Sequence, residues 1–326
     1  MKTTEMRLGT LACAAVAMLT CASPLMAQDA LPNRTFKIIV PFVAGTGLDI
    51  TTRPIAENLA TRIGRTVIVD NKPGAGHVAA ANEIRNATPD GTTMVVSTTT
   101  MAVRSGIANA PYDIRKDMDH IVMRGEGPFI LYVNPSLPVK SPKELADYAL
   151  ANPGKLNFST IGPGSSTHFA AINFALMTGA KFESIHYKGS APAITATIAG
   201  ETQASFDQIG LVRAQAQGGR ARMLAVSGLR RWPDLPDLPT MDESGFKGFN
   251  VIFWMGFSTT KGTPRSTINA LNAAFNEIYK DPATIDMTTK SGAVLIGGTP
   301  EQMQKAVEAE VEQWQRLIKA GNVIIE

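Results

Sequence analysis

The stretch FKIIVPFVAGTGLDI, residues 36–50, decides the fold class of this chain. Residues 36–42 are rich in β-branched and aromatic side chains and predict a buried strand. A glycine loop follows, and residues 48–63 place Ile55, Leu59 and Ile63 on one apolar helical face. A strand, a short glycine loop and a helix form the start of a βαβ unit. The segment therefore predicts an α/β fold with parallel strands.

A second series of the same kind begins with a predicted strand at 156–159, the loop TIGPGSSTH at 160–168 and a helix at 167–177. Apolar runs at 129–133 and 251–257 are expected to cross between two lobes. Each lobe would then contain a mixed, mostly parallel sheet flanked by helices, with a ligand cleft between the lobes. The predicted division is 28–128 for the first part of lobe 1, 129–250 for lobe 2 and 251–326 for the returning part of lobe 1.

Further elements follow from the same periodicities. Two capping boxes, Ser141 to Glu144 and Thr299 to Gln302, mark helix starts. Strands are predicted at 66–70, 93–97, 184–187, 203–206 and 223–227, and helices at 77–86, 191–199, 212–217, 264–280 and 300–320.

The composition excludes several classes of function. The chain has 326 residues, of which 44% are hydrophobic and 18% charged, as in a globular protein of about two domains. A net charge of +3 is too small for a nucleic-acid partner, and none is expected. Two cysteines and four histidines leave little room for a zinc site. We expect no cofactor, no metal and a monomeric protein.

Residues 1–27 have the layout of a secretory signal peptide. Lys2 and Arg7 precede an apolar run at 8–21, which is too short to span a membrane. Cleavage is expected after Ala27, with Ala22 as the alternative. Both cysteines lie within this segment, so the exported chain would contain none. The pattern predicts a periplasmic protein.

The two glycine loops are the strongest indications of function. Each loop joins a buried strand to a helix, so several backbone N–H groups and the positive helix end point to one place. Two such loops in equivalent positions predict a shared anionic ligand. Neither loop is a nucleotide-binding fingerprint, because Ile50 stands at the third glycine position and no GxxxxGK[ST] motif occurs. Asp49, Ser166 and Thr167 also suit helix caps.

A hydrolase that uses Ser165 and His168 is the rival class. No GxSxG motif surrounds Ser165, and His168 is expected in a first helical turn, where the helix dipole disfavours its protonation. His77, His120 and His186 have no metal-ligand spacing, and His120 is expected at the surface. The sequence therefore predicts a binding protein and not an enzyme.

Other polar side chains are expected at the carboxyl ends of strands, where ligands bind in open α/β sheets. A negative charge at Asp207 would repel a second ligand carboxylate, unless Asp207 caps a helix or meets an amine. Thr46 and Asp207 are expected to select the ligand, while the glycines and Ser165 supply general carboxylate affinity. The predicted far wall of the site consists of Phe42, Thr98, Thr99, Thr100, Tyr187 and Asp207.

Short segments along the whole mature chain match a known family in order. They are IVPFVAG (39–45) with Asp49, DNKPGAG (70–76), PDGT (89–92), PYD (111–113), NPGKLN (152–157), the loop 162–168, HYKG (186–189), LPDLPT (235–240) and GTP (262–264). With these segments the chain resembles the solute-binding receptors of tripartite tricarboxylate transporters, also called Bug-type periplasmic receptors.

The resemblance implies a type II periplasmic binding protein fold in which two loops pinch a ligand carboxylate, assisted by ordered waters. This chain departs from the family in having Thr46 where a second glycine is usual and His77 where glycine is common. The implied function is capture of a small organic carboxylate and its delivery to membrane transporter subunits. A sensory protein that signals to a membrane kinase is the alternative. The implied contacts are Ala44, Gly45, Thr46, Asp49, Gly164, Ser165, Ser166, Thr167 and His168.

Overall fold

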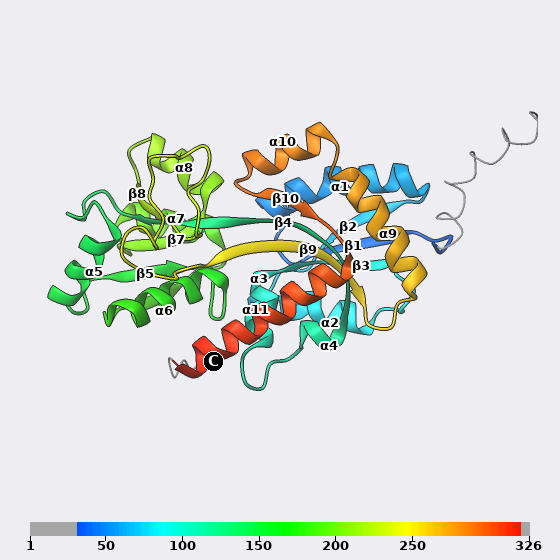
Figure 1. Ribbon diagram of the computed structural model, residues 1–326, viewed down its shortest axis with the longest axis horizontal. Coiled ribbons are helices and arrows are strands. Elements are labelled where there is room, and N and C mark those ends of the chain that lie inside the picture. The colour runs from blue at the N-terminus through cyan, green and yellow to red at the C-terminus, as the bar shows by residue number, and fades with distance from the viewer. Residues whose placement is uncertain (1–30, 321–326) are drawn as a thin grey trace, which may run out of the picture.

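The computed structural model describes residues 31–320 and has one long strand, β4 (Met118–Val133), that belongs to two groups of strands (Figure 1). Residues 118–128 of β4 belong to the first sheet half, with β1 (Phe36–Val40), β2 (Val67–Asn71), β3 (Thr93–Thr98), β9 (Ile252–Thr260) and β10 (Val294–Gly297). Residues 129–133 belong to the second sheet half, with β5 (Asn157–Thr160), β6 (Glu183–His186), β7 (Ala204–Gln208) and β8 (Arg222–Val226).

The strand order is β2-β1-β3-β9-β4-β7-β5-β6, and β10 and β8 pair with β4 off this path. β1 is parallel to β2 and β3, and β5 is parallel to β6 and β7. The two long strands β4 and β9 are antiparallel to each other and to their other neighbours. The mixed α/β sheet predicted from the sequence is confirmed.

Helices cover both faces of the sheet, as side-chain alternation along β1 requires. Ile38 packs in the core that includes α1 (Gly47–Ile63) and α9 (Arg265–Ile278), whereas the next residue, Ile39, packs against the opposite helices. These opposite helices are α2 (Val78–Asn86), α3 (Thr99–Ser105), α4 (Ile114–Asp117) and α11 (Pro300–Ala320). The second sheet half is covered by α5 (Pro142–Ala151), α6 (Ser166–Thr178), α7 (Ser190–Ala199) and α8 (Ile209–Gln217).

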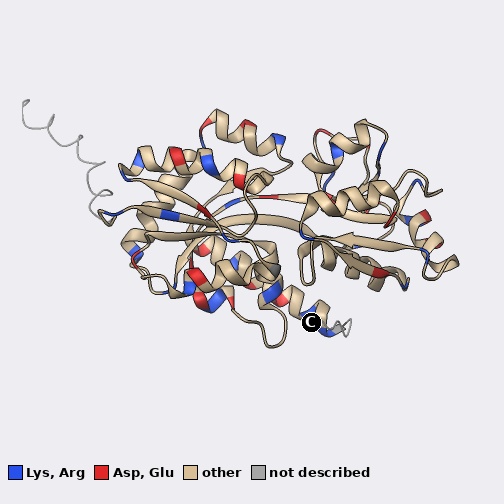
Figure 2. Ribbon diagram, turned by 180° about the vertical axis from the view of Figure 1, so that it is seen from behind, with Lys and Arg blue, Asp and Glu red and all other residues tan. Residues whose placement is uncertain are grey.

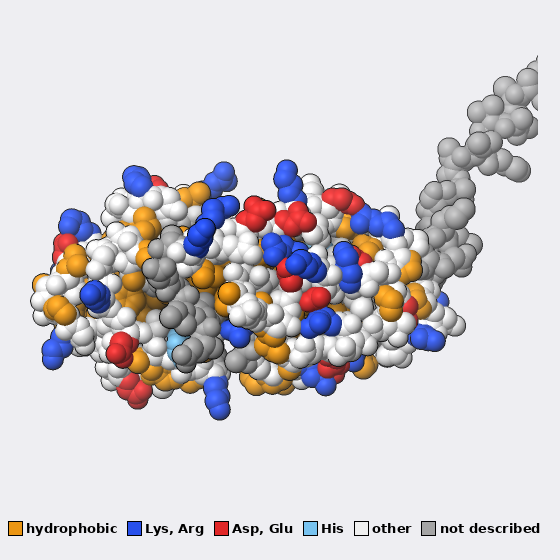
Figure 3. Space-filling model, turned by 90° about the horizontal axis from the view of Figure 1, so that it is seen from below, with side chains coloured by type: hydrophobic (Ala, Val, Ile, Leu, Met, Phe, Trp, Pro, Cys, Tyr) orange, Lys and Arg blue, Asp and Glu red, His pale blue; other side chains and the backbone are white. Residues whose placement is uncertain are grey.

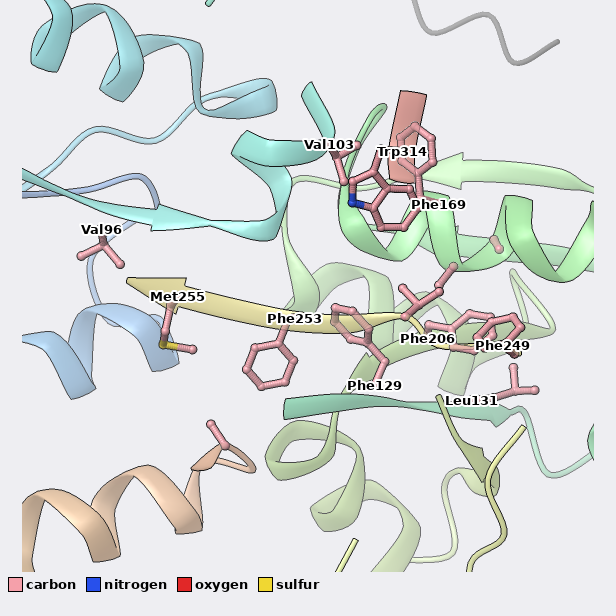
Figure 4. Packing of buried hydrophobic residues seen from close by; sticks show 14 of the residues in the cluster. Val96, Val103, Phe129, Leu131, Phe169, Phe206, Phe249, Phe253, Met255 and Trp314 are labelled. Atoms are coloured by element: carbon pink, nitrogen blue, oxygen red, sulfur yellow. The ribbon is translucent and has the colours of Figure 1, made fainter. Parts of the chain in front are cut away.

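β4 and β9 connect the two ends of the elongated molecule (Figure 1). The predicted crossing segments 129–133 and 251–257 lie almost entirely within these strands, but β4 begins at Met118 and β9 continues to Thr260. Phe129 and Phe253 face each other at the junction, with ring centroids 5.5 Å apart (Figure 4). The junction is therefore a packed hydrophobic connection.

α11 also bridges the molecule. It begins beside the first sheet half and brings Trp314 against Phe169 of α6, with ring centroids 5.0 Å apart (Figure 4). Val103 of α3 lies next to this pair in the same view. Residues from both ends of the molecule therefore contribute to one large hydrophobic core.

Several features differ from the sequence predictions. The helix α10 (Pro282–Lys290) and the strand β10 were not predicted, and their apolar side chains are partly or fully exposed. Residue 99 starts α3 and does not end a strand. His120 is 3% exposed and not at the surface, because it lies in the central strand β4 and its Nδ1 hydrogen-bonds the Ser258 hydroxyl at 2.8 Å.

Within residues 31–320, no helix is both long and apolar enough to cross a membrane. The predicted signal segment, 1–27, lies outside the described residues.

Candidate functional site

The loop between β1 and α1, residues 41–46, is the first part of the candidate site. Gly45 has φ +83°, a left-handed conformation that favours glycine. The Thr46 hydroxyl does not cap α1 but donates to the Val43 carbonyl at 3.0 Å. Because the first N–H groups of a helix have no acceptor within the helix, the amides of Gly47, Leu48 and Asp49 are suited to an external acceptor.

Asp49 organises this loop from within. Its carboxylate accepts from the Gly45 amide at 2.9 Å, from Arg53 Nη2 at 2.8 Å and from Asn71 Nδ2 at 3.0 Å. Burial alone would raise the pKa of Asp49, but these hydrogen bonds and the charge of Arg53 hold it below its ordinary value. The carboxylate is 2% exposed and surrounded by donors of its own chain. Asp49 therefore stabilises the conformation of the loop.

His77 contacts the same loop through its imidazole ring. Its Nδ1 lies 2.9 Å from the Pro41 carbonyl oxygen, and its ring meets Phe42 edge-on with centroids 4.7 Å apart. The residue has φ +57° and is 4% exposed, and burial lowers its pKa to about 4. A neutral imidazole therefore occupies the position where the resemblance described above leads one to expect glycine. The sequence showed that histidine replaces the usual glycine at this position, but it did not predict the contact of His77 with Phe42.

The loop between β5 and α6, residues 161–165, is the second part of the candidate site. Gly164 has φ +68°. Ser165 caps α6, because its hydroxyl accepts from the His168 amide at 3.3 Å. The Thr167 hydroxyl accepts from the Ile161 amide at 3.1 Å and ties the loop to the helix. Gly164, Ser165, Ser166 and Thr167 are all buried, so this loop is far less exposed than residues 43–45.

His168 closes the second loop as a neutral side chain. Its Nδ1 lies 3.2 Å from the Gly164 amide, which can only donate, so Nδ1 is the acceptor and Nε2 bears the proton. Burial, together with the neighbouring His186 ring at 4.7 Å, lowers the pKa of His168 to about 4. The acceptor role of Nδ1 agrees with the predicted neutral state, and burial is the largest cause of the lowered pKa.

This geometry gives a hydrolase no support. The Ser165 hydroxyl accepts from the His168 backbone and lies 3.2 Å from Thr167 Oγ1, while the acceptor nitrogen of the His168 ring is occupied by Gly164. A nucleophilic serine needs that acceptor as its base. Within the described residues, no group of three or more histidines, cysteines or acidic residues could hold a metal ion.

The residues of the predicted far wall lie at the ends of four strands, β1, β3, β6 and β7. Thr99 Oγ1 accepts from the Trp254 amide at 2.7 Å and so joins α3 to β9, whereas the Thr98 hydroxyl is buried without a partner in the described part of the chain. Tyr187 is partly exposed, and its hydroxyl lies 3.5 Å from Glu201. These positions follow β3 and β6 and support the sheet-edge placement, while their contact with a ligand remains a prediction.

Asp207 lies at the end of β7 and is 1% exposed. One carboxylate oxygen accepts from the Ser190 hydroxyl at 2.9 Å and from the Gln208 amide at 2.8 Å, and the other oxygen has no partner within the described chain. Burial raises the pKa of Asp207 to about 6, although both hydrogen bonds oppose the shift. Asp207 thus joins the starts of α7 and α8, and its free oxygen is an unfilled acceptor.

The two loops lie in different sheet halves, and the contacts described above hold each loop to its own half. α3 lies against α6, so the end of β3 comes close to the second half. At the first loop the apolar side chains of Val43 and Ile50 are 55% and 58% exposed. Elsewhere, charges of both signs are interspersed on the helices seen from behind (Figure 2) and over the surface seen from below (Figure 3).

A mixed sheet with helices on both faces is the architecture of periplasmic solute-binding proteins. The chain is similar to the periplasmic binding protein BugD, with 31% identity and a TM-score of 0.81 over 90% of this chain and 99% of BugD. It belongs to the tripartite tricarboxylate transporter family of receptors, whose family model matches residues 51–323. Members of this family are receptors and not enzymes.

Two further solved structures similar to this chain contain ligands. An R. palustris structure with adipate is 29% identical, with a TM-score of 0.82 over 89% of this chain and 98% of its own. MatC from Rhodopseudomonas palustris with bound malate is 27% identical, with a TM-score of 0.81 over 88% of this chain and 100% of MatC. The bound molecules in both similar structures are carboxylates.

Proposed function

We propose that this receptor captures a small organic carboxylate between the loops 41–46 and 161–165 and delivers it to the membrane subunits of a tripartite tricarboxylate transporter. The observation that carries the proposal is the pair of strand–loop–helix junctions, because the helices that follow could both offer N-terminal amides to one ligand. The ligands adipate and malate of two similar structures support the carboxylate class.

The amides assigned to the ligand differ from those expected from the sequence. The Gly45 amide donates to Asp49, the Gly164 amide to His168 and the Ser165 amide to the Gly162 carbonyl. We therefore assign ligand contact to the first-turn amides of the helices, which are those of Gly47 and Leu48 in α1 and Ser166 and Thr167 in α6. Neither loop contains Lys or Arg, so amides must carry most of the contact with the carboxylate.

The proposed cycle includes closure of a cleft. The units that move would be 28–128 with 251–326, and 129–250, and the hinge would lie in β4 and β9 where Phe129 meets Phe253. The receptor would act as a monomer in the periplasm, after removal of residues 1–27. The apolar side chains of Val43 and Ile50 would then come to lie over the bound ligand.

The test is a thermal-shift and calorimetric panel of mono-, di- and aromatic carboxylates that includes malate and adipate. A ligand should raise the melting temperature with its concentration, and small-angle scattering should show a more compact protein. Amides of the same acids, which lack the negative charge, are the control. The proposal would be contradicted if no carboxylate of the panel changed the melting temperature at high concentration. It would also be contradicted if the protein hydrolysed carboxylate esters and Ser165→Ala abolished this activity.

A further inference from the structure

Arg124 is a buried cation without an anionic partner in the described part of the chain. It lies in β4 and is 1% exposed. Its Nη1 donates to the Thr52 hydroxyl at 3.2 Å and its Nη2 to the Thr51 carbonyl at 3.3 Å, while Nε has no partner. Burial lowers the pKa of Arg124 to about 10, so the guanidinium remains charged at neutral pH. Fully buried arginines are rare unless they are paired.

The surroundings of Arg124 supply no compensating charge among the described residues. The ring of Tyr279 is close, but its hydroxyl is buried without a partner, and burial keeps it un-ionised by raising its pKa. On α1, Asp49 forms an ion pair with Arg53, and these two charges cancel. Within residues 31–320, no carboxylate lies at ion-pair distance from the Arg124 guanidinium. The positive charge of Arg124, which lies against α1, is therefore not neutralised by a described residue.

Arg124 is connected to the first loop through α1. The Thr52 hydroxyl that accepts from Arg124 also donates to the Leu48 carbonyl at 2.6 Å, within the first turn of the helix. Leu48 is one of the residues whose amide we assign to the ligand. The positive charge of the guanidinium thus reinforces the positive potential at the N-terminus of α1. Because Arg124 is buried, solvent screens this charge little.

We propose that Arg124 is a positioning residue that supplies, through α1 and without direct contact, the positive charge that a carboxylate at the first loop requires. This inference rests on the proposed function. At 1.5 Å per residue, Thr51 lies roughly 8 Å along α1 from the loop, so the separation of the charges is about 10 Å. With an effective dielectric constant of about 20, a pair at this distance changes affinity about tenfold.

A thiol placed in the loop measures this charge without any ligand. In the full chain with Cys13 and Cys21 replaced by alanine, Thr46→Cys introduces one partly exposed thiol at the loop. The rate of its alkylation by iodoacetamide as a function of pH gives the thiol pKa. Arg124→Met should raise that pKa and reduce the thiolate fraction at neutral pH roughly three- to tenfold. Should methionine prevent folding, Arg124→Gln is equally neutral and can still donate to Thr52.

Arg222→Met is the matched control. Arg222 is also held by backbone carbonyls, those of Pro135, Leu137 and Val139, but it lies in β8 of the second sheet half. Its loss should leave the thiol pKa unchanged. A purely structural role for Arg124 would lower stability in Arg124→Met and Arg124→Gln without moving the thiol pKa, and that result overturns the inference.

Calorimetry with adipate and malate gives the second readout, in chains that retain Thr46. Arg124→Met should weaken binding of both about tenfold. A shift of the thiol pKa in a protein that binds no carboxylate of the panel would overturn the proposed function alone. Equal affinities for the natural chain and the Arg124→Met variant would overturn the role of this charge in binding.

Discussion

Glu310 gives the clearest prediction about the pH dependence of folding. Its carboxyl group joins α11 to β9, because it accepts from the indole Nε1 of Trp254 and, at 3.0 Å, from that of Trp314. Trp314 in turn packs on Phe169 of α6. Burial raises the pKa of Glu310 from 4.5 to about 8; the hydrogen bond from Trp314 opposes this shift and the charge of Glu126 adds to it.

The sign of the effect follows from proton binding. Below pH 4.5 Glu310 is protonated in both the folded and the unfolded chain, so its contribution is fully present. Between pH 4.5 and about 8 the unfolded chain releases this proton while the folded chain keeps it. Stability must therefore fall as the pH rises through this range. The whole shift corresponds to at most about 5 kcal/mol, and since the side chain is partly exposed we expect about 2–3 kcal/mol.

Urea unfolding at a series of pH values from about 5 to 9 measures this loss. Glu310→Gln cannot ionise and should lose about 2–3 kcal/mol less than the natural chain over the same range. Glu312→Gln, two residues further along α11 and exposed, is the control and should follow the natural chain. Parallel stability curves for Glu310→Gln and the natural chain would refute the argument that this carboxyl is held protonated.

Three further predictions concern the loops. Asp49→Ala should lower the free energy of unfolding by about 2–4 kcal/mol, because Gly45 and Arg53 lose a buried partner; urea titration that finds less than about 1 kcal/mol would contradict this. Gly164→Val forces a β-branched residue to φ +68° and should weaken the binding of all carboxylates together. Thr46→Gly should instead change the order of preference among carboxylates. Calorimetry of both variants with the same panel tests this, and an equal change of every affinity in Thr46→Gly would show that Thr46 does not select the ligand. NMR of the side-chain nitrogens should show His168 neutral and protonated on Nε2 at pH 6, and an imidazole titrating near 6.5 would contradict its burial.

Local features were predictable because they depend on neighbouring residues. The capping box at Ser141 is confirmed, since Ser141 accepts from the Glu144 amide at 3.2 Å and Glu144 from the Lys140 amide at 2.8 Å. The box at Thr299 is confirmed in the same way, with Gln302 accepting at 2.8 Å. Both glycine loops also lie between the predicted strand and helix. Within such segments the hydrogen-bond partners are three or four residues apart, so spacing is informative.

Long-range features were not predictable from spacing. Arg124 meets Thr52 across 72 residues, and His120 meets Ser258 across 138 residues. A lone arginine or histidine carries no sign of the strand that will bury it. The length of β4 was missed for a related reason, because Gly125 and Gly127 interrupt the apolar pattern. In the structure, Gly125 and Gly127 pack closely against the backbone at Val294 and Gly292. A Cβ atom at either glycine would clash with a backbone oxygen there.

The difference between the two loops bears on the order of binding. The first loop is exposed at Val43 and Ala44, and the helix behind it is uncapped, so its amides are open to solvent. The second loop is buried at Gly164 and Ser165, and Thr167 ties it to Ile161. An exposed set of amides supported by a buried positive charge favours the first encounter with an anion, because long-range attraction raises association rates. We therefore expect the carboxylate to meet the first loop before the second loop closes over it.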